Sequence, residues 1–237
     1  MTREEIVLQN WQDVQSSLQS VCERTGRNPS EITLLAVTKY AQDTDVLTLL
    51  KNGKLTDIGE SRVQQAWARW RENPAFAAYP AIQKHFIGHL QKNKAAKAAQ
   101  LFDWVDSLDD MDTARILSTH TPPGKTLRVL VQIKLTDKVT QSGLDLPHAR
   151  QLARQLKTAF NNLVVCGYMA VAPQGAPEKV LRHLFKNVKA AFDEDFKNTP
   201  RAQLSLGMSE DYLVALEEGS TLPRLGSLLF SRNLEGL

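Results

Sequence analysis

The sequence repeats one pattern eight times, a short apolar run followed by a segment with helical periodicity. Some of these runs are almost continuously apolar, as at residues 34–37 and 129–131, which is typical of strands covered on both faces. Eight strand–helix alternations in a chain of 237 residues favour a closed barrel over an open sheet. The predicted strands are residues 32–39, 56–60, 85–88, 102–108, 127–135, 163–171, 203–207 and 222–225.

A separate amphipathic pattern precedes the first of these runs. Apolar residues recur at spacings of three and four from Ile6 to Cys22, and Gly26 follows as a stop signal. We therefore predict an α/β chain that forms a single (β/α)8 TIM barrel with an extra N-terminal helix, as one domain over residues 1–237. The helices expected between the strands cover residues 45–52, 61–71, 91–100, 109–118, 147–160, 177–192 and 210–217.

The composition argues against several classes of function. Charged residues make up 23% of the chain but leave a net charge of only +3, so no concentrated basic face for nucleic acid is indicated. The first residues are charged where a signal peptide would be apolar, and no apolar run approaches the ~20 residues of a membrane span. Cys22 and Cys166 lie far apart without metal-ligand spacing, which indicates free thiols in a reducing compartment. The sequence predicts a cytoplasmic protein without nucleic-acid, membrane or metal partners.

Lys39 is the first residue that could carry chemistry. It closes the apolar run Leu34-Leu35-Ala36-Val37-Thr38, and functional side chains of such barrels lie where strands end. An amine that projects into the barrel mouth is partly dehydrated and can act as a nucleophile. A surface lysine whose stem covers the strand end is an equally good interpretation of this feature alone.

Two small-residue segments near the end of the chain indicate an anion site. Ser205, Gly207, Met208 and Ser209 join the seventh predicted strand to a helix, and the eighth strand is followed by Gly226-Ser227. Small residues let a ligand approach backbone N–H groups, and barrels often bind phosphate on the loops after strands seven and eight. Ordinary helix capping by Ser209 and Gly219 would explain part of the pattern without a ligand.

Arg224 lies within the last apolar strand, two residues before Gly226, so it is expected to point inward. A buried guanidinium needs hydrogen-bond acceptors, because an unpaired buried charge is costly. A carboxylate in the core would meet this need, and so would the ring nitrogen of a heteroaromatic cofactor. Two histidines are candidates for the rim of a pocket: His85 begins the third predicted strand, and His89 follows its end.

Short motifs follow one another along the chain in an order that is known from one family. They are Ala36-Val37-Thr38-Lys39, Ile58-Gly59-Glu60, His85-Phe86-Ile87-Gly88, Val129-Leu130-Val131-Gln132-Ile133, Gly167 with Met169-Ala170, Leu204-Ser205-Leu206-Gly207-Met208-Ser209, Gly219-Ser220-Thr221 and Arg224-Leu225-Gly226-Ser227. In these motifs the chain resembles the pyridoxal phosphate homeostasis protein family, whose barrel is like the N-terminal domain of alanine racemase. The resemblance covers essentially the whole predicted barrel.

The resemblance implies a fold-type III barrel that binds pyridoxal 5′-phosphate (PLP) as a Schiff base on Lys39. It also implies that Arg224 lies against the pyridine nitrogen of PLP. The phosphate is expected near Ser205, Gly207, Met208, Ser209, Gly226 and Ser227. The pocket expected from the family further includes Ser61, His85 and Met169.

Several positions depart from the family pattern. An asparagine–tyrosine pair after Gly-Glu is replaced by Ser61-Arg62, and a proline is replaced by His89. Two family lysines are replaced by Ala41 and Gln141. The resemblance therefore implies cofactor binding more firmly than any role of the lost lysines, such as passing PLP onward.

Three functions are compatible with these residues. The first is a PLP-binding protein of cofactor homeostasis, a monomer without turnover, with apo PLP-dependent enzymes as possible partners. The second is a racemase, which needs a base on each face of its substrate. In alanine racemase the second base comes from a separate C-terminal domain, whereas this chain ends with the barrel. The third, a cofactor-free aldolase using Lys39, leaves Arg224 and the small-residue segments unexplained. Because Arg224 can only donate hydrogen bonds, it would leave the pyridine nitrogen unprotonated and the ring a poor electron sink, which favours the binding role.

Overall fold

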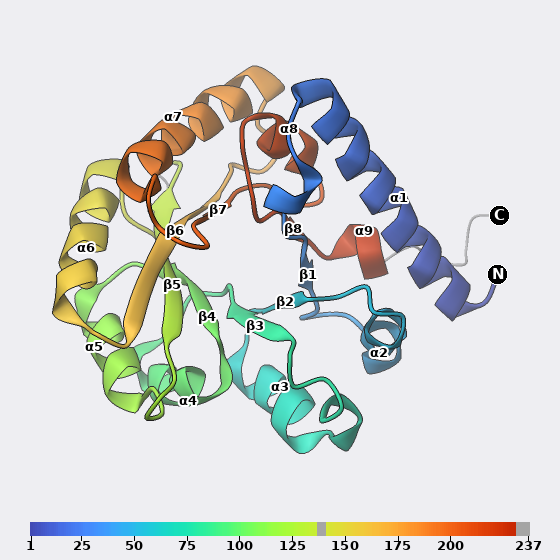
Figure 1. Cartoon of the computed structure of the whole chain (residues 1–237), viewed down its shortest axis with the longest axis horizontal. Coiled ribbons are helices and arrows are strands. Elements are labelled where there is room, and N and C mark those ends of the chain that lie inside the picture. The colour runs from blue at the N-terminus through green and yellow to red at the C-terminus, as the bar shows by residue number, and fades with distance from the viewer. Residues whose placement is uncertain (137–140, 231–237) are drawn as a thin grey trace.

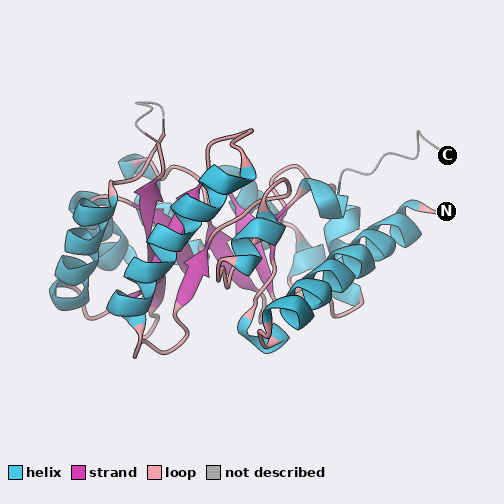
Figure 2. Ribbon diagram, turned by 90° about the horizontal axis from the view of Figure 1, so that it is seen from above, coloured by secondary structure: helices cyan, strands magenta, loops and turns pink. Residues whose placement is uncertain are grey.

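The computed structural model describes residues 1–136 and 141–230, and its eight parallel strands form one curled sheet surrounded by helices (Figures 1 and 2). The strand order is β7-β6-β5-β4-β3-β2-β1-β8, so strands that are consecutive in sequence pair with each other, except that β8 pairs with β1 and not with β7. The strands are β1 (Leu35–Val37), β2 (Asp57–Glu60), β3 (Gln83–Phe86), β4 (Trp104–Leu108), β5 (Leu127–Lys134), β6 (Leu163–Val171), β7 (Gln203–Ser205) and β8 (Arg224–Leu225). The predicted (β/α)8 barrel is confirmed.

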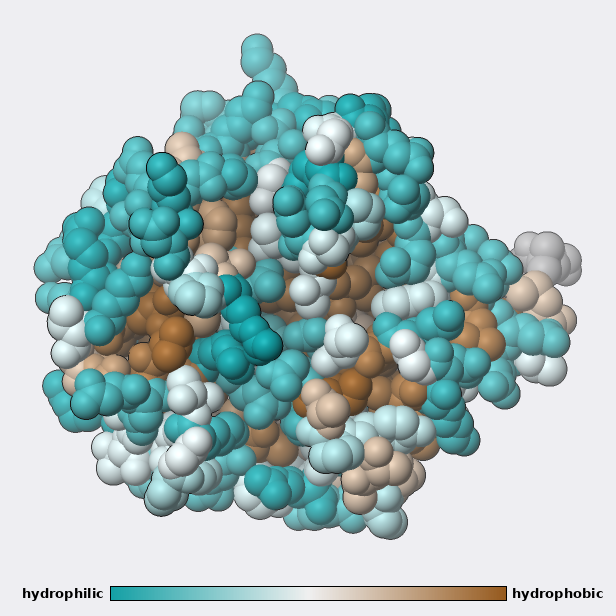
Figure 3. All heavy atoms as spheres, in the orientation of Figure 1, coloured by the Kyte–Doolittle hydropathy of each residue, from teal (hydrophilic) through white to brown (hydrophobic). Residues whose placement is uncertain are grey.

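Helices follow the strands on the outside of the barrel. They are α1 (Arg3–Thr25), α2 (Asp43–Lys51), α3 (Val63–Trp67), α4 (Lys92–Leu101), α5 (Met111–His120), α6 (Leu146–Ala159), α7 (Glu178–Phe196), α8 (Tyr212–Glu217) and α9 (Ser227–Phe230). Short 3-10 turns lie at Pro29–Glu31 and Pro74–Phe76, and a π-helical turn follows α3 at Ala68–Glu72. Polar residues cover most of the face seen in Figure 3, and apolar side chains show in the hollows between them. Among the described helices, none is long and apolar enough to cross a membrane.

The predicted N-terminal helix is α1, and both of its ends follow from the sequence. Thr2 and Glu5 form a capping box at its start, and Gly26 ends it in the left-handed conformation with φ of 69°. Its apolar face packs against α2, α8 and α9 (Figure 1). The helix thus joins the elements that follow β1 to those at the end of the described chain.

The barrel has a seam between β7 and β8, which form no regular ladder. Individual hydrogen bonds close it instead: the Thr221 amide donates to the Leu204 carbonyl at 2.9 Å, and the Arg224 amide donates to the Gly207 carbonyl at 3.0 Å. The Ser205 hydroxyl donates to the Leu222 carbonyl at 3.0 Å. The seam therefore brings both small-residue segments together.

The buried apolar side chains form two clusters, one outside the strands and one inside the barrel. The larger one lies between the strands and the outer helices. The smaller one includes Leu35, Trp104, Leu130, Cys166 and Met169. Side chains of strands β1, β4, β5 and β6 thus fill the space inside the barrel, as close packing requires.

Candidate functional site

A cavity of about 650 Å³ opens where strands β1, β6, β7 and β8 lead into their loops. Its wall takes residues from four segments that are far apart in sequence: 37–41 after β1, 171–176 after β6, 208–211 after β7 and 224–227 at β8. A volume of this size is ordinary for a small-molecule site. Six predicted site residues line this one cavity: Lys39, Met208, Ser209, Arg224, Gly226 and Ser227.

Lys39 lies in the turn after β1 and is half-buried. Its amine stands 5.1 Å from the centre of the Tyr40 ring, which also lines the cavity. The same lysine borders a second, more polar hollow of about 430 Å³ beside Asp43 and Arg69. Lys39 therefore borders both the cavity and this neighbouring hollow.

The turn that carries Lys39 is held by Arg69 from the π-helical turn after α3. The Arg69 guanidinium donates to the carbonyls of Thr38 and Ala41, both at 2.9 Å, and it forms ion pairs at 2.7 Å with Asp43 and Glu60. The Thr38 hydroxyl donates to the same Glu60 carboxylate at 2.8 Å. This support could not be predicted from the sequence, because nothing in the helical pattern of residues 61–71 signals a π-helical turn.

Arg224 projects from β8 into the barrel and is only 5% exposed. Its guanidinium donates to the Ser205 carbonyl, the Ser205 hydroxyl and the Ala170 carbonyl, each at 2.8 Å. Within residues 1–136 and 141–230 it forms no ion pair with a carboxylate. Burial lowers the pKa of Arg224 to about 10, against the opposing effect of the charges of Asp106 and Asp211. A buried cation on neutral acceptors thus lines the cavity.

Two glycines in the small-residue segments lie close to neighbouring parts of the chain. Gly207 has φ of 87°, and a Cβ there would lie 2.6 Å from the Ala215 Cβ, so only glycine fits this joint between β7 and α8. A Cβ on Gly226 would lie 3.2 Å from the Val37 carbonyl oxygen, which shows how closely β8 passes β1. Met208 donates its amide to the Asp211 carboxylate at 2.6 Å.

Five predicted pocket residues do not line the cavity. Ser205 and Gly207 are buried, and the Ser205 hydroxyl accepts a hydrogen bond from Arg224. Met169 and His85 are each 1% exposed in the barrel interior, and Ser61 lies half-buried after β2. A cofactor contact at these five positions stays a prediction.

Two positions that depart from the family pattern have structural partners. The Gln141 side chain accepts from the Thr136 amide at 3.0 Å and donates to the Val171 carbonyl at 2.7 Å, so it ties the chain after β5 to the end of β6. The exposed His89 ring lies 3.4 Å from the Ser142 hydroxyl. His89 is absent from the cavity lining, whereas Ala41 belongs to it.

Comparisons with known proteins identify the family of this chain. No family model matches the sequence. Curated relatives named pyridoxal phosphate homeostasis protein include one from Escherichia coli K12, 31% identical over 94% of this chain and 95% of its own length. Another, from Synechocystis, is 34% identical over 87% of this chain and 94% of its own length.

Solved structures agree with these relatives. PipY of Synechococcus elongatus, with PLP bound, has a TM-score of 0.75 and 29% identity over 90% of this chain and 99% of its own. Alanine racemase of Clostridium difficile, at 12% identity and a TM-score of 0.70, covers 96% of this chain with 58% of its own and shares the fold alone. With at least 30% identity to curated members over nearly its whole length, the chain belongs to the pyridoxal phosphate homeostasis protein family.

Proposed function

We propose that this protein binds PLP in the cavity at the ends of β1, β6, β7 and β8, and that it serves PLP homeostasis. One observation carries the proposal: Lys39 and the buried Arg224 guanidinium, which has no carboxylate partner among the described residues, line the same cavity. Family membership and the PLP-bound relative PipY support it. We further infer that residues 1–237 act as one domain, since β1 pairs with β8 in a single sheet.

Arg224 tests whether the cavity suits a pyridine ring. Its guanidinium has five N–H donors and no acceptor, and its recorded acceptors are all neutral oxygens of Ser205 and Ala170. An unprotonated ring nitrogen is a further neutral acceptor, so it fits this wall without adding a buried charge. The residues present are therefore compatible with the cofactor.

Lys39 would hold the other end of the ring. When bound, PLP supplies an aldehyde that can condense with a lysine amine and release one water. The contacts that Arg69 and Glu60 make around residues 38–41 fix the backbone from which the Lys39 side chain extends. The chain thus provides one rigid turn for the amine and one rigid strand for Arg224.

The phosphate is assigned to the segments that contain Ser209 and Ser227, since both line the cavity. Neutral hydroxyl and amide donors there would face a doubly charged group. Asp211 already accepts the Met208 amide, so a phosphate that uses this amide has to replace the carboxylate. Cytoplasmic location, a monomeric state and delivery of PLP to apo enzymes remain predictions from the sequence.

We expect pyridoxal, which lacks the phosphate, to bind at least about tenfold more weakly than PLP, because charge-assisted hydrogen bonds each contribute about 1.5–3 kcal/mol. Ser227→Asp adds a negative charge at the phosphate site and should weaken PLP more than pyridoxal. Ser20→Asp is the matched control, since both serines are exposed and Ser20 lies on α1. Titrations followed by absorption give the affinities. Equal affinities for PLP and pyridoxal would contradict the phosphate assignment.

The binding role and the racemase role differ in one measurable property. Arg224 would keep the ring nitrogen unprotonated, so the loaded protein should withdraw little electron density from a bound amino acid. We expect negligible exchange of the α-proton of alanine or serine for deuterium in heavy water, as followed by NMR. Steady exchange that scales with the concentration of the protein would instead favour the racemase hypothesis.

A further inference from the structure

The short helix α9 links the cavity to the outside of the barrel. Its first residue, Ser227, and its last residue, Phe230, both line the cavity. The amides of Leu229 and Phe230 donate to the Gly226 carbonyl, both at 3.0 Å, so these residues form one closed helical turn. The place of Ser227 in the cavity wall therefore depends on what holds α9.

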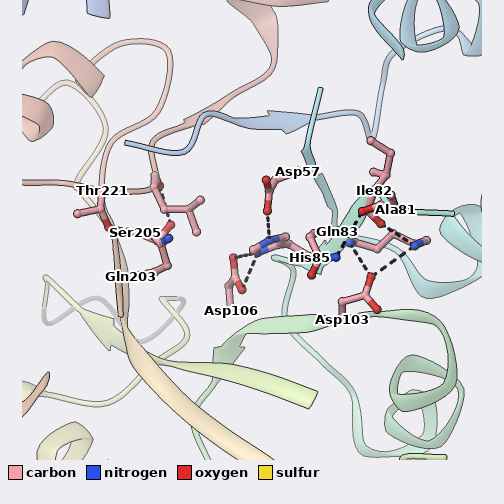
Figure 4. Close-up of polar contacts among 12 residues, drawn as sticks. Asp57, Ala81, Ile82, Gln83, His85, Asp103, Asp106, Gln203, Ser205 and Thr221 are labelled. Carbon is pink, nitrogen blue, oxygen red and sulfur yellow. Dashed lines mark hydrogen bonds and ion pairs between the residues drawn. The ribbon is translucent and has the colours of Figure 1, made fainter. Parts of the chain in front are cut away.

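The sheet itself holds α9 only weakly. The strand before it, β8, comprises Arg224 and Leu225 alone, and these two residues pair with β1. On the side of β7 there is no ladder, and single hydrogen bonds join the two segments, as between the Thr221 hydroxyl and Gln203 at 2.7 Å (Figure 4). Within the described residues, none of the hydrogen bonds across this seam reaches beyond Arg224 toward α9. Contacts from outside the sheet therefore have to fix α9.

The extra N-terminal helix α1 supplies these contacts. It packs against α9 on the outside of the barrel (Figure 1). The side-chain amide of Asn10, which is 1% exposed, donates to the Leu229 carbonyl at 3.1 Å. The Arg3 guanidinium donates to the Phe230 carbonyl and forms an ion pair at 2.6 Å with the buried Asp45 of α2. The last two carbonyls of α9 are thus both bound by side chains of α1.

An amide at position 10 is costly if its only task is to fill space. The Asn10 Oδ1 atom is buried and has no hydrogen-bond partner among the described residues. Apolar side chains fill the same face of α1 at Val7 and Val14, and they avoid the cost of an unpaired polar atom. The group that needs the Asn10 amide is the carbonyl of Leu229, a fully buried residue. Asn10 is therefore better explained by its bond to α9 than by packing.

We propose that Asn10 and Arg3 are positioning residues of the PLP site: they hold α9 against the barrel, so that Ser227 and Phe230 keep their places in the cavity wall. Neither Asn10 nor Arg3 lines the cavity, so both act through α9. Because the phosphate is assigned to the segment of Ser227, the two residues support phosphate binding more than binding of the ring. The effect on PLP rests on the proposed function, whereas the attachment of α9 to α1 does not.

The first test follows amide hydrogen exchange by NMR in the protein without added PLP. Asn10→Ala should speed exchange of the Leu229 and Phe230 amides at least about tenfold, because α9 opens more often once its carbonyl loses a donor. Val21→Ala is the control: Val21 is also buried on α1, and its truncation removes no hydrogen bond to α9. It should change exchange of the two amides less than about twofold. Equal exchange in wild type and Asn10→Ala would overturn the inference, whatever the protein does with PLP.

The second test compares the Kd values for PLP and for pyridoxal, measured by absorption titration. Asn10→Ala should raise the Kd for PLP at least about fivefold and the Kd for pyridoxal less than about twofold, because only PLP carries the phosphate. A general loss of stability would weaken both ligands by the same factor. Val21→Ala should therefore leave the ratio of the two Kd values as in wild type.

Two results separate the inference from the proposed function. If wild-type protein fails to bind PLP, the proposed function is wrong, and the exchange experiment alone decides whether α1 holds α9. If wild-type protein binds PLP and Asn10→Ala keeps the wild-type ratio of Kd values, the inference is wrong. The double variant Arg3→Met, Asp45→Asn removes the donor to Phe230 without leaving a buried carboxylate unpaired. It should act in the same direction, and it decides the question if Asn10→Ala does not fold, as judged by near-UV circular dichroism.

Discussion

Lys39→Ala is expected to abolish covalent attachment of PLP. Wild-type protein incubated with PLP and reduced with borohydride should carry one pyridoxyl group on Lys39, because this amine borders the cavity that Arg224 also lines. The variant should carry none, as measured by intact mass and peptide mapping. An adduct that persists in Lys39→Ala, or that maps to another lysine, would refute the assignment.

Two further variants test whether PLP is captured by the amine of Lys39 or only attracted by its positive charge. Lys39→Arg keeps a positive charge at the cavity but has no amine that can condense with an aldehyde, so it should bind PLP reversibly without a reduced adduct. Lys134→Ala is the matched control, because Lys134 ends strand β5 as Lys39 follows β1, yet it does not line the cavity. It should keep the adduct. Covalent capture would then depend on position rather than on the number of lysines.

The barrel could be predicted because its strands are dense apolar runs. Residues 163–171 were predicted as a strand and form β6 over the same span, since the run is long and buried on both faces. The first and last strands are shorter than predicted. The Thr33 amide donates to the Thr221 carbonyl and the Thr38 amide donates to the Gly59 carbonyl, but these bonds lie outside the regular ladder. Periodicity indicates which residues are buried and does not show where a ladder ends.

The candidate site was predictable only in part. Lys39 and Arg224 stand out in the sequence because each is a charged residue at the end of an apolar strand or within one. His85 was predicted as a rim residue, whereas it lies in the barrel interior between carboxylates 28 and 21 residues away in sequence. Asp57 and Asp106 come from the neighbouring strands β2 and β4. Such contacts depend on strand register, which local sequence does not contain.

The buried His85 ring lies between the carboxylates of Asp57 and Asp106, and this arrangement predicts how stability changes with pH. The pKa of His85 is raised from 6.5 to about 9 by folding, so the cationic ring favours the folded state. This contribution is fully present below the unfolded pKa of 6.5 and is lost as the pH rises through about 9. The difference corresponds to about 3 kcal/mol of unfolding free energy.

We therefore expect wild-type protein to lose up to about 3 kcal/mol of unfolding free energy between about pH 6.5 and pH 9, as measured by urea denaturation. Other groups titrate near the upper end of this range: burial raises the pKa of Cys166 from 9.0 to about 11, so this thiol also weakens the folded state above about pH 9. His85→Gln removes the imidazole and keeps this thiol, so the difference between the two proteins isolates the ring. Parallel pH profiles for wild type and His85→Gln would mean that folding does not raise the pKa of His85.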